Sequence, residues 1–378
     1  MIINRKITES IEKTLAKEPR IILLYGPRQS GKTTLLNFLL PKLNEQEVVF
    51  LNGDDLRTQE DLSIANLDLL KKTIGSKKFL FIDEAQRISN IGLSLKLLFD
   101  SLAIKIIASG SSSFELASKI DEPLTGRAVI FYLYPIAVGE LIPNLPNLSL
   151  KNRLEDFLLF GMYPKVLTTE SADDKQKYLY DLINAYLYKD ILSFASVRKP
   201  KKVIDLLSLL SLQIGSEVSI AELASHLALS KQIVEKYLDI LEKMFVIFNL
   251  RGFSRNLRKE IYKTSKYYFW DLGLRNALIR NFNRLNLRQD KGAMLENFFL
   301  IEKLKQNNNA GKFANFYFWR TYDQKEIDFI EEKDGLLYAY EIKWGEKIVN
   351  PPKDWVRTYS NSKFFPVSLD NFLEFFYE

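Results

Sequence analysis

The stretch Ile21-Ile22-Leu23-Leu24-Tyr25-Gly26-Pro27-Arg28-Gln29-Ser30-Gly31-Lys32-Thr33-Thr34-Leu35-Leu36 decides the fold of the first part of the chain. An apolar run typical of a buried strand comes first, and a glycine-bounded loop separates it from the start of an apolar helix. Gly26 and Gly31 let the backbone curl so that successive N–H groups point at an anion, and the helix N-terminus adds partial positive charge. We therefore predict that Gly26–Thr34 binds the phosphates of a nucleotide.

Two side chains of this loop have more specific predicted roles. Lys32 supplies a full positive charge for the terminal phosphates, and the Thr33 hydroxyl completes the coordination shell of a phosphate-bound Mg²⁺. The expected cofactors are therefore ATP and Mg²⁺, and the expected nucleotide contacts are Gly26, Pro27, Arg28, Gln29, Ser30, Gly31, Lys32, Thr33 and Thr34.

A second apolar run, Lys77–Ile82, ends in two acids, Asp83 and Glu84. In nucleotide-binding folds of this kind, a buried strand next to the strand of the phosphate loop delivers an Asp to the Mg²⁺. Asp83 has that place in the sequence, and Glu84 follows where a general base could polarise the attacking water. The alternative is a strand end with two solvated acids.

Two further polar positions follow along the chain. Lys105–Ser113 has the pattern of a buried strand that ends in small hydroxyl residues, and Ser109 or Ser111 could hold the attacking water or contact the γ-phosphate. A turn without function explains them equally well. Arg127 begins another strand-like segment and could stabilise the charge that develops in phosphoryl transfer, on its own subunit's nucleotide or on a neighbour's in a homo-oligomer. A salt bridge or a solvated arginine is the alternative.

The order of these motifs resembles a known family. Gly-Pro-Arg-Gln-Ser-Gly-Lys-Thr-Thr, Phe-Ile-Asp-Glu-Ala-Gln, Ser-Gly-Ser-Ser and a Gly-Arg pair before Tyr-Pro-Ile-Ala-Val-Gly-Glu look like the motifs of AAA-type ATPases. More narrowly, they resemble prokaryotic ATPases with a C-terminal domain of unknown function called DUF4143, along essentially the whole chain. The resemblance implies an ATPase in which Lys32 and Thr33 are the Walker A pair, and Asp83 and Glu84 the Walker B pair. Ser109 or Ser111 would stand at the sensor position, where many AAA proteins have Asn or Thr.

The middle of the chain is predicted to be mostly helical. Prolines at 143 and 146 indicate a linker, and residues 143–202 are expected to form a helical lid or linker region. Residues 203–252 have the pattern of a winged-helix domain, because a short helix, a turn and a second helix over Lys231–Met244 precede a strand. The charge of that second helix is mixed, so DNA contact and a packing role both remain open.

The basic excess of the chain lies between Arg251 and Lys291. Eleven basic residues face three acidic ones there, whereas the formal net charge of the whole chain is +6. Aromatic residues at 253, 262 and 267–270 are interleaved with them, and cations with aromatics are what a phosphate backbone and exposed bases attract. The alternative is a solvated face over an aromatic core. The basic residues are Arg251, Arg255, Arg258, Lys259, Lys263, Lys266, Arg275, Arg280, Arg284, Arg288 and Lys291.

A second acidic constellation lies in the last part of the chain. Two strand patterns joined by a turn at Asp334-Gly335 predict a hairpin that places Asp328 close to Glu341. Alternation puts Lys343 on the same face as Glu341, and Glu296 could join from a preceding helix. Two converging carboxylates can hold Mg²⁺, and a nearby lysine can orient a water or stabilise charge at a phosphate.

The order Glu296, Asp328, Glu341-Ile342-Lys343 resembles the PD-(D/E)xK nuclease fold, with Ile327 in place of the usual proline. The resemblance implies a restriction-endonuclease-like α/β domain with Asp328 and Glu341 as metal ligands, and Glu296 and Lys343 as further catalytic residues. A binding or inactive version of the site, or ordinary charges on surface strands, are the alternatives.

Composition sets the remaining limits. The chain has no cysteine and a single histidine, which excludes disulfides, thiolate metal sites and zinc sites built on histidines. No apolar signal-peptide run and no membrane-spanning run is present, so we expect a cytoplasmic protein. The expected fold class is α/β: an AAA-type P-loop domain (1–142) is followed by a helical region (143–202), a winged-helix-like domain (203–252) and the α/β nuclease-like domain (253–378). The expected function is a Mg²⁺-dependent ATPase whose C-terminal part binds DNA or RNA. The alternative is an ATP-dependent signalling switch that acts through protein partners.

Overall fold

The computed structural model describes residues 3–17, 19–111, 124–144, 147–184, 197, 199–254, 265–321, 323–345 and 349–377. The chain divides into two compact units, which we call the N-terminal and C-terminal units. The N-terminal unit comprises Ile2–Pro135 and Lys243–Phe245, and the C-terminal unit comprises Ile136–Glu242 and Val246–Glu378. The long first segment of the N-terminal unit ends at residue 135, whereas the sequence predicts a domain boundary at residue 142.

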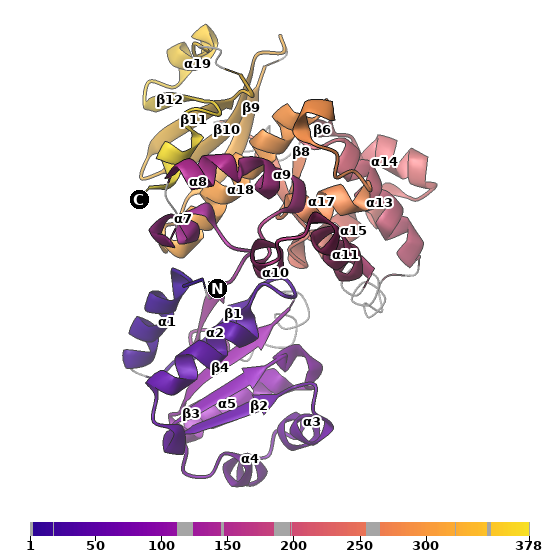
Figure 1. The fold of residues 1–378 in the computed structure, drawn as a ribbon. Helices are drawn as coiled ribbons and strands as arrows, with labels where there is room; N and C mark the ends of the chain where they lie inside the picture. Colours follow the sequence, from indigo (N-terminus) through magenta and orange to yellow (C-terminus); the bar gives the residue numbers. More distant parts are fainter. Residues whose placement is uncertain are drawn as a thin grey trace. The chain divides into compact units, whose positions relative to one another are not determined.

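The N-terminal unit is built on a parallel sheet of five strands in the order β2-β3-β4-β1-β5 (Figure 1). Because all pairs are parallel, the carboxyl ends of the strands meet at one edge, where ligands bind in folds of this kind. The strand that ends in Asp83 is separated from β1 by β4, so the expectation that it lies next to the strand of the phosphate loop is wrong. The strands are β1 (Ile21–Tyr25), β2 (Val48–Asn52), β3 (Phe79–Asp83), β4 (Lys105–Gly110) and β5 (Ala128–Tyr132).

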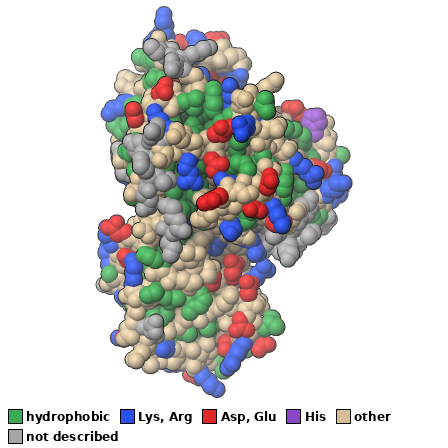
Figure 2. Space-filling model, viewed as in Figure 1, with side chains coloured by type: hydrophobic (Ala, Val, Ile, Leu, Met, Phe, Trp, Pro, Cys, Tyr) green, Lys and Arg blue, Asp and Glu red, His purple; other side chains and the backbone are tan. Residues whose placement is uncertain are grey.

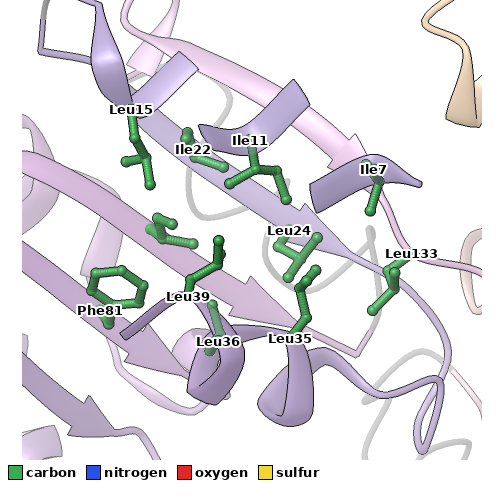
Figure 3. Close-up of a cluster of buried hydrophobic side chains, with 11 residues drawn as sticks. Ile7, Ile11, Leu15, Ile22, Leu24, Leu35, Leu36, Leu39, Phe81 and Leu133 are labelled. Carbon is green, nitrogen blue, oxygen red and sulfur yellow. The ribbon is translucent and has the colours of Figure 1, made fainter. Parts of the chain in front are cut away.

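Helices α1 and α2 cover part of this sheet through one apolar cluster (Figure 3). Leucines at 35, 36 and 39 recur at helical spacing on α2, and Ile7, Ile11 and Leu15 do so on α1. Both sets pack on Ile22 and Leu24 of β1, and burying each such side chain stabilises the fold by about 1.5–3 kcal/mol. The helices of this unit are α1 (Ile7–Ala16), α2 (Lys32–Leu39), α3 (Leu56–Ser63), α4 (Leu67–Ile74) and α5 (Ile91–Leu102), with 3₁₀ turns η1 (Leu40–Lys42), η2 (Glu45–Glu47) and η3 (Ala85–Arg87).

The C-terminal unit is built on a mixed sheet of seven strands in the order β12-β11-β10-β9-β7-β8-β6. Strand β7 pairs in parallel with β9, so the sheet continues through residue 252, where the sequence predicts a domain boundary. The strands are β6 (Glu217–Val218), β7 (Ile247–Gly252), β8 (Ser265–Phe269), β9 (Asn315–Arg320), β10 (Glu326–Lys333), β11 (Leu336–Ile342) and β12 (Ser362–Val367).

Helices surround this sheet, and two of them form the predicted helix-turn-helix. Ser219 caps α14, Ala228 ends it in a left-handed conformation, and α15 follows after Ser230, whose hydroxyl accepts from a first-turn N–H. Within the described residues, no helix is long and apolar enough to span a bilayer. The helices are α7 (Val138–Leu141), α8 (Asn147–Asn152), α9 (Leu154–Phe160), α10 (Pro164–Thr168), α11 (Ala172–Leu182), α13 (Pro200–Leu212), α14 (Ile220–Leu227), α15 (Lys231–Lys243), α17 (Leu272–Leu278), α18 (Lys291–Asn309) and α19 (Lys353–Thr358). The 3₁₀ turns are η4 (Ile142–Asn144), η6 (Leu285–Leu287) and η7 (Phe372–Phe376).

A buried aspartate joins two distant segments of the C-terminal unit. Asp271 caps α17 and also accepts the N–H of Met162, at 2.7 Å, from the loop between α9 and α10. Gly161 in that loop has a φ of +78°, and a Cβ there would lie 2.0 Å from Asp271 Oδ1, so only glycine fits. Burial raises the pKa of Asp271 to about 6.

Candidate functional site

The predicted phosphate-binding loop connects β1 to α2 in the N-terminal unit. A Cβ at Gly26 would lie 2.1 Å from the carbonyl oxygen of Leu133, so this position requires glycine. Gln29 and Gly31 have positive φ angles of 60° and 99°, which curl the loop before α2 begins at Lys32. The strand, loop and helix thus follow one another as the sequence predicts.

The lysine of the loop is buried rather than solvated. Lys32 is 4% exposed, and its ammonium group donates to the carbonyls of Gly26 and Pro27, both at 2.9 Å. The Ser30 hydroxyl is also fully buried and has no hydrogen-bond partner within the described residues. An unsatisfied buried hydroxyl beside a held ammonium group fits a loop that receives an anionic, oxygen-rich ligand.

Asp83 is brought to the mouth of the loop. The Thr33 hydroxyl donates to Asp83 Oδ2 at 2.5 Å, and the Ser109 hydroxyl donates to Asp83 Oδ1. Hydroxyl and carboxylate oxygens are the hard ligands that Mg²⁺ prefers, so the residues present fit this cation.

Glu84 lies beside the same centre in a left-handed conformation, with φ of 52°. Its backbone N–H donates to Asp83 Oδ1 at 3.1 Å, and its carboxylate accepts from the Gln86 amide at 2.5 Å. The same amide nitrogen lies 3.0 Å from the Ser111 hydroxyl. Ser109 and Ser111 therefore contact the two acids, one directly and one through Gln86, because β4 lies between β1 and β3. Sequence reasoning missed Gln86, although its place two residues after Glu84 could have indicated it.

A second missed residue holds the loop from outside the motif. The Arg5 guanidinium donates to the carbonyl of Ser30 at 2.8 Å and to that of Tyr134 at 2.6 Å. These partners lie 25 and 129 residues along the chain, so no local pattern could have indicated the contact.

Arg127 lies at the wrong end of the sheet to act on its own subunit's nucleotide. It precedes β5, and its carbonyl accepts the N–H of Ile21, the first residue of β1, whereas Gly26 follows the last. Five strand residues span roughly 13–17 Å. The Arg127 side chain forms a two-pronged pair with Asp100 at 2.8 and 3.1 Å. The salt-bridge alternative therefore describes this subunit, and action on a neighbour's nucleotide remains a prediction.

The second acidic centre lies at the end of the β10–β11 hairpin. Phe329 pairs with Tyr340, and a shift in register between β10 and β9 spans Asp328. The Lys343 ammonium group lies 2.7 Å from Glu341 Oε1 and 3.4 Å from Asp328 Oδ2. Asp328 also accepts the N–H of Ile342 at 2.7 Å. The structure thus brings Asp328, Glu341 and Lys343 together.

Glu296 reaches this centre from α18, but its direct partners come from β8. The Tyr268 hydroxyl donates to Glu296 Oε1 at 2.5 Å, and the Lys266 ammonium group lies 3.6 Å from the same oxygen. Lys266 also donates to Glu326 at the start of β10. Sequence reasoning missed Lys266, Tyr268 and Glu326 as members of this cluster.

Burial dominates the electrostatics of these acids. It raises the pKa of Glu296 to about 7, and repulsion from Asp328 adds to the rise. Burial likewise raises the pKa of Asp328, against the lowering effect of Lys343, and the pKa of Glu341, with further repulsion from Asp328. Carboxylates whose charge is disfavoured in this way gain from an added cation.

Within the described residues, much of the basic segment is buried rather than exposed. Three of its cations are buried: Lys266 serves the acidic centre, and Arg275 and Arg288 share Asp290 at 2.5 and 2.6 Å. Five of its six described aromatics are core residues, at 7% exposure or less, and the sixth, Phe282, is half-buried. On the face shown in Figure 2, basic and acidic side chains are interspersed. Arg255, Arg258, Lys259 and Lys263 lie outside the described residues. The buried aromatics are Phe253, Tyr267, Tyr268, Phe269 and Trp270.

Three stretches of the chain match family models. Residues 18–142 match a model described as an AAA domain, and residues 291–353 match the domain of unknown function DUF4143. Residues 151–285 match another domain of unknown function, DUF8612. The first match supports the predicted AAA-type P-loop domain, and the second confirms that a DUF4143 domain follows it in the chain.

Full-length similarities point to prokaryotic proteins. The chain is 27% identical over 346 residues to an uncharacterised protein of Methanocaldococcus jannaschii, covering 85% of this chain and 75% of that one. It is 29% identical over 350 residues to an uncharacterised protein of Mycobacterium tuberculosis, covering 91% and 74%. A solved structure, the Walker-type ATPase of Pyrococcus abyssi, is similar with a TM-score of 0.49 and 18% identity, over 74% of this chain and 96% of that one.

Proposed function

We propose that the chain is a Mg²⁺-dependent ATPase whose C-terminal unit carries a nuclease-like divalent-cation centre that acts on nucleic acid. The observation that supports it most is the contact between Thr33 and Asp83 at the mouth of the phosphate loop. This contact joins Thr33, the residue after Lys32, to Asp83 at the end of β3, although the two residues are far apart in the sequence.

The roles of the residues follow from their positions. Lys32 would exchange its two carbonyl partners for the terminal phosphates of ATP, and Thr33 and Asp83 would hold Mg²⁺, which shields the phosphate charge. Glu84 would accept a proton from the attacking water, with Gln86 orienting its carboxylate. Ser109 would keep Asp83 in place through its hydroxyl.

The C-terminal half of the proposal rests on Asp328, Glu341 and Lys343. Glu341 Oε2 is buried and has no hydrogen-bond partner among the described residues, so a divalent cation fits between this carboxylate and Asp328. Asp328 and Glu341 would hold such a cation, which would supply Lewis-acid chemistry for the hydrolysis of a phosphodiester. Lys343 would orient a water or stabilise charge on the phosphate.

One experiment tests both halves. ATP hydrolysis is measured with Mg²⁺, with and without double- and single-stranded DNA, and the DNA is examined on a gel. We expect Lys32→Ala to lose hydrolysis, and Asp328→Ala to keep hydrolysis but lose DNA cleavage. The exposed Lys42→Ala is the matched control for the lysine.

The alternative is an ATP-dependent switch that acts through protein partners. The burial of five aromatics of the basic segment, at 253 and 267–270, favours it, because these rings are not available for bases to stack on. Hydrolysis that ignores DNA, with the DNA intact and unbound, would reject the nucleic-acid half and leave this alternative.

A further inference from the structure

The acidic centre of the C-terminal unit contains four carboxylates and two lysines. Glu296, Glu326, Asp328 and Glu341 form one electrostatic neighbourhood, because repulsion from Glu326 raises the pKa of each of the other three. The lysines divide the acids between them. Lys266 pairs with Glu296 and Glu326, and Lys343 pairs with Glu341 and Asp328.

The two lysines differ in whether their ammonium groups can move away from the carboxylates. The Lys266 side chain is 2% exposed, it extends from β8 within the sheet, and its ammonium group lies over the Phe318 ring. The Lys343 side chain is 41% exposed and follows the last residue of β11. An entering cation can therefore displace the ammonium group of Lys343 into solvent, whereas Lys266 has no solvent-facing position to move to.

The hydrogen bonds show the same asymmetry. Within the described residues, Glu341 Oε2 is the one oxygen of these four carboxylates that is buried without a hydrogen-bond partner. Glu296 already accepts from Tyr268, and Glu326 accepts from Lys266. No group of three or more Asp, Glu, His or Cys residues in the described part of the chain converges on a common metal position. This geometry matches a two-carboxylate site completed by water.

We infer that the Lys266 ammonium group takes the place of a second divalent cation, so that this centre binds one divalent cation, between Asp328 and Glu341. Lys266 holds Glu296 and Glu326 as its own counter-ions and keeps them out of the metal's coordination shell. It is a positioning residue, contributed by β8 from outside the residues that match DUF4143. The inference rests on the proposed metal site at Asp328 and Glu341.

Counting bound Mn²⁺ in the nucleotide-free, full-length chain tests the inference, with free Mn²⁺ measured by electron paramagnetic resonance. The difference between wild type and Asp328→Asn gives the number of ions at this centre and removes any contribution of the N-terminal unit. We expect a difference of one ion. We also expect Lys266→Met to bind one ion more than wild type, whereas Lys266→Arg, which keeps the charge, binds the same number as wild type.

Melting temperature gives a second readout that needs no catalysis. Unpairing Glu296 and Glu326 in Lys266→Met is expected to lower the Tm by about 5 °C or more in EDTA, and Mn²⁺ should restore most of the loss. The Tm of wild type should differ less between EDTA and Mn²⁺, because EDTA cannot remove the ammonium group of Lys266. A folded Lys266→Met protein that binds the same number of ions as wild type overturns the inference, as does a wild type that binds two.

Glu296→Gln keeps the test decisive if Lys266→Met does not fold. If Glu296 only neutralises Lys266, the Kd for Mn²⁺ should change by less than about twofold. A tenfold weakening would make Glu296 a metal ligand and overturn the inference. If Asp328→Asn loses no Mn²⁺, the proposed metal site itself is absent, and the role of Lys266 fails with it. That outcome differs from one in which Asp328→Asn loses one Mn²⁺ ion but Lys266→Met binds the same number of ions as wild type. The second outcome would contradict only the role of Lys266.

Discussion

The two centres of this chain hold their charges by different means. In the N-terminal centre, neutral groups hold the ions: backbone carbonyls hold Lys32, and hydroxyls hold Asp83. In the C-terminal centre, ionised groups of opposite charge hold one another, because the ammonium groups of Lys266 and Lys343 are paired with buried carboxylates. Neutral partners can be exchanged for a ligand at low cost, whereas breaking a buried ion pair leaves an uncompensated charge. The first centre is suited to repeated loading and release, whereas in the second the buried Lys266 pairs are suited to a permanent electrostatic arrangement and the exposed Lys343 can be displaced.

The largest effect should come from the general base of the N-terminal centre. Glu84→Gln keeps the size and the polar contacts of the side chain but cannot accept a proton. We expect kcat for ATP hydrolysis to fall by about 10²–10⁴, with ATP affinity nearly unchanged. Steady-state hydrolysis and nucleotide-binding titrations check this, with the exposed Glu60→Gln as control. A Glu84→Gln protein with wild-type turnover would remove Glu84 from the mechanism.

The C-terminal centre should make stability depend on pH through Glu296. Its pKa is raised in the folded chain to about 7 from 4.5, so the folded state binds a proton that the unfolded state has lost between these values. The free energy of unfolding should therefore fall as pH rises from about 4.5 to 7, by up to roughly 3 kcal/mol.

Denaturant unfolding across this pH range measures that slope. Glu296→Gln should flatten it, and the exposed Glu374→Gln should not. An identical slope in wild type and Glu296→Gln would show that Glu296 carries no such linkage.

A smaller effect should separate the two serines of the N-terminal centre. Ser109→Ala removes a hydrogen bond to the Asp83 carboxylate, and bonds to charged groups contribute about 1.5–3 kcal/mol, so the Mg²⁺ concentration for half-maximal hydrolysis should rise by about tenfold. Ser111→Ala is the matched control, because its hydroxyl contacts Gln86 rather than Asp83. It should lower kcat and leave the Mg²⁺ requirement unchanged. Equal Mg²⁺ requirements in both variants would contradict the arrangement.

The smallest effect should come from Arg127. Its ion pair with Asp100 is solvent-accessible, so Arg127→Ala should leave the stability of the folded chain nearly unchanged. At protein concentrations that keep the chain monomeric, hydrolysis should change by less than about twofold. Rates measured over a range of protein concentrations complete the test. A loss of activity that appears only at high concentration would establish action on a neighbouring subunit.

The sequence predicted what is local and missed what is assembled over long distances. The loop, its helix and the acids at 83 and 84 are contiguous, so their order determines their chemistry. Strand order is not contiguous, and the position of β4 between β1 and β3 could not be predicted from any one segment. Arg5 and Lys266 meet partners far along the chain, beyond the range of any motif.

The basic segment shows a different limit of sequence reasoning. A count of charges does not say which side chains point inward. Here Lys266, Arg275 and Arg288 neutralise acids of the same unit, and five of the interleaved aromatics that the structure describes fill the core. Alternation along a strand predicts faces, but it does not predict which of two faces is covered by helices.

The pairing of β7 with β9 has a consequence for dissecting this chain. The match to DUF8612 ends at residue 285, and the match to DUF4143 begins at residue 291. Strand β7 lies before this junction in the sequence, and its partner β9 lies after it. Separating the two pieces would leave each with a long, unprotected strand edge, which is a template for aggregation. The two domains of unknown function are therefore expected to be inherited, expressed and unfolded as one cooperative body.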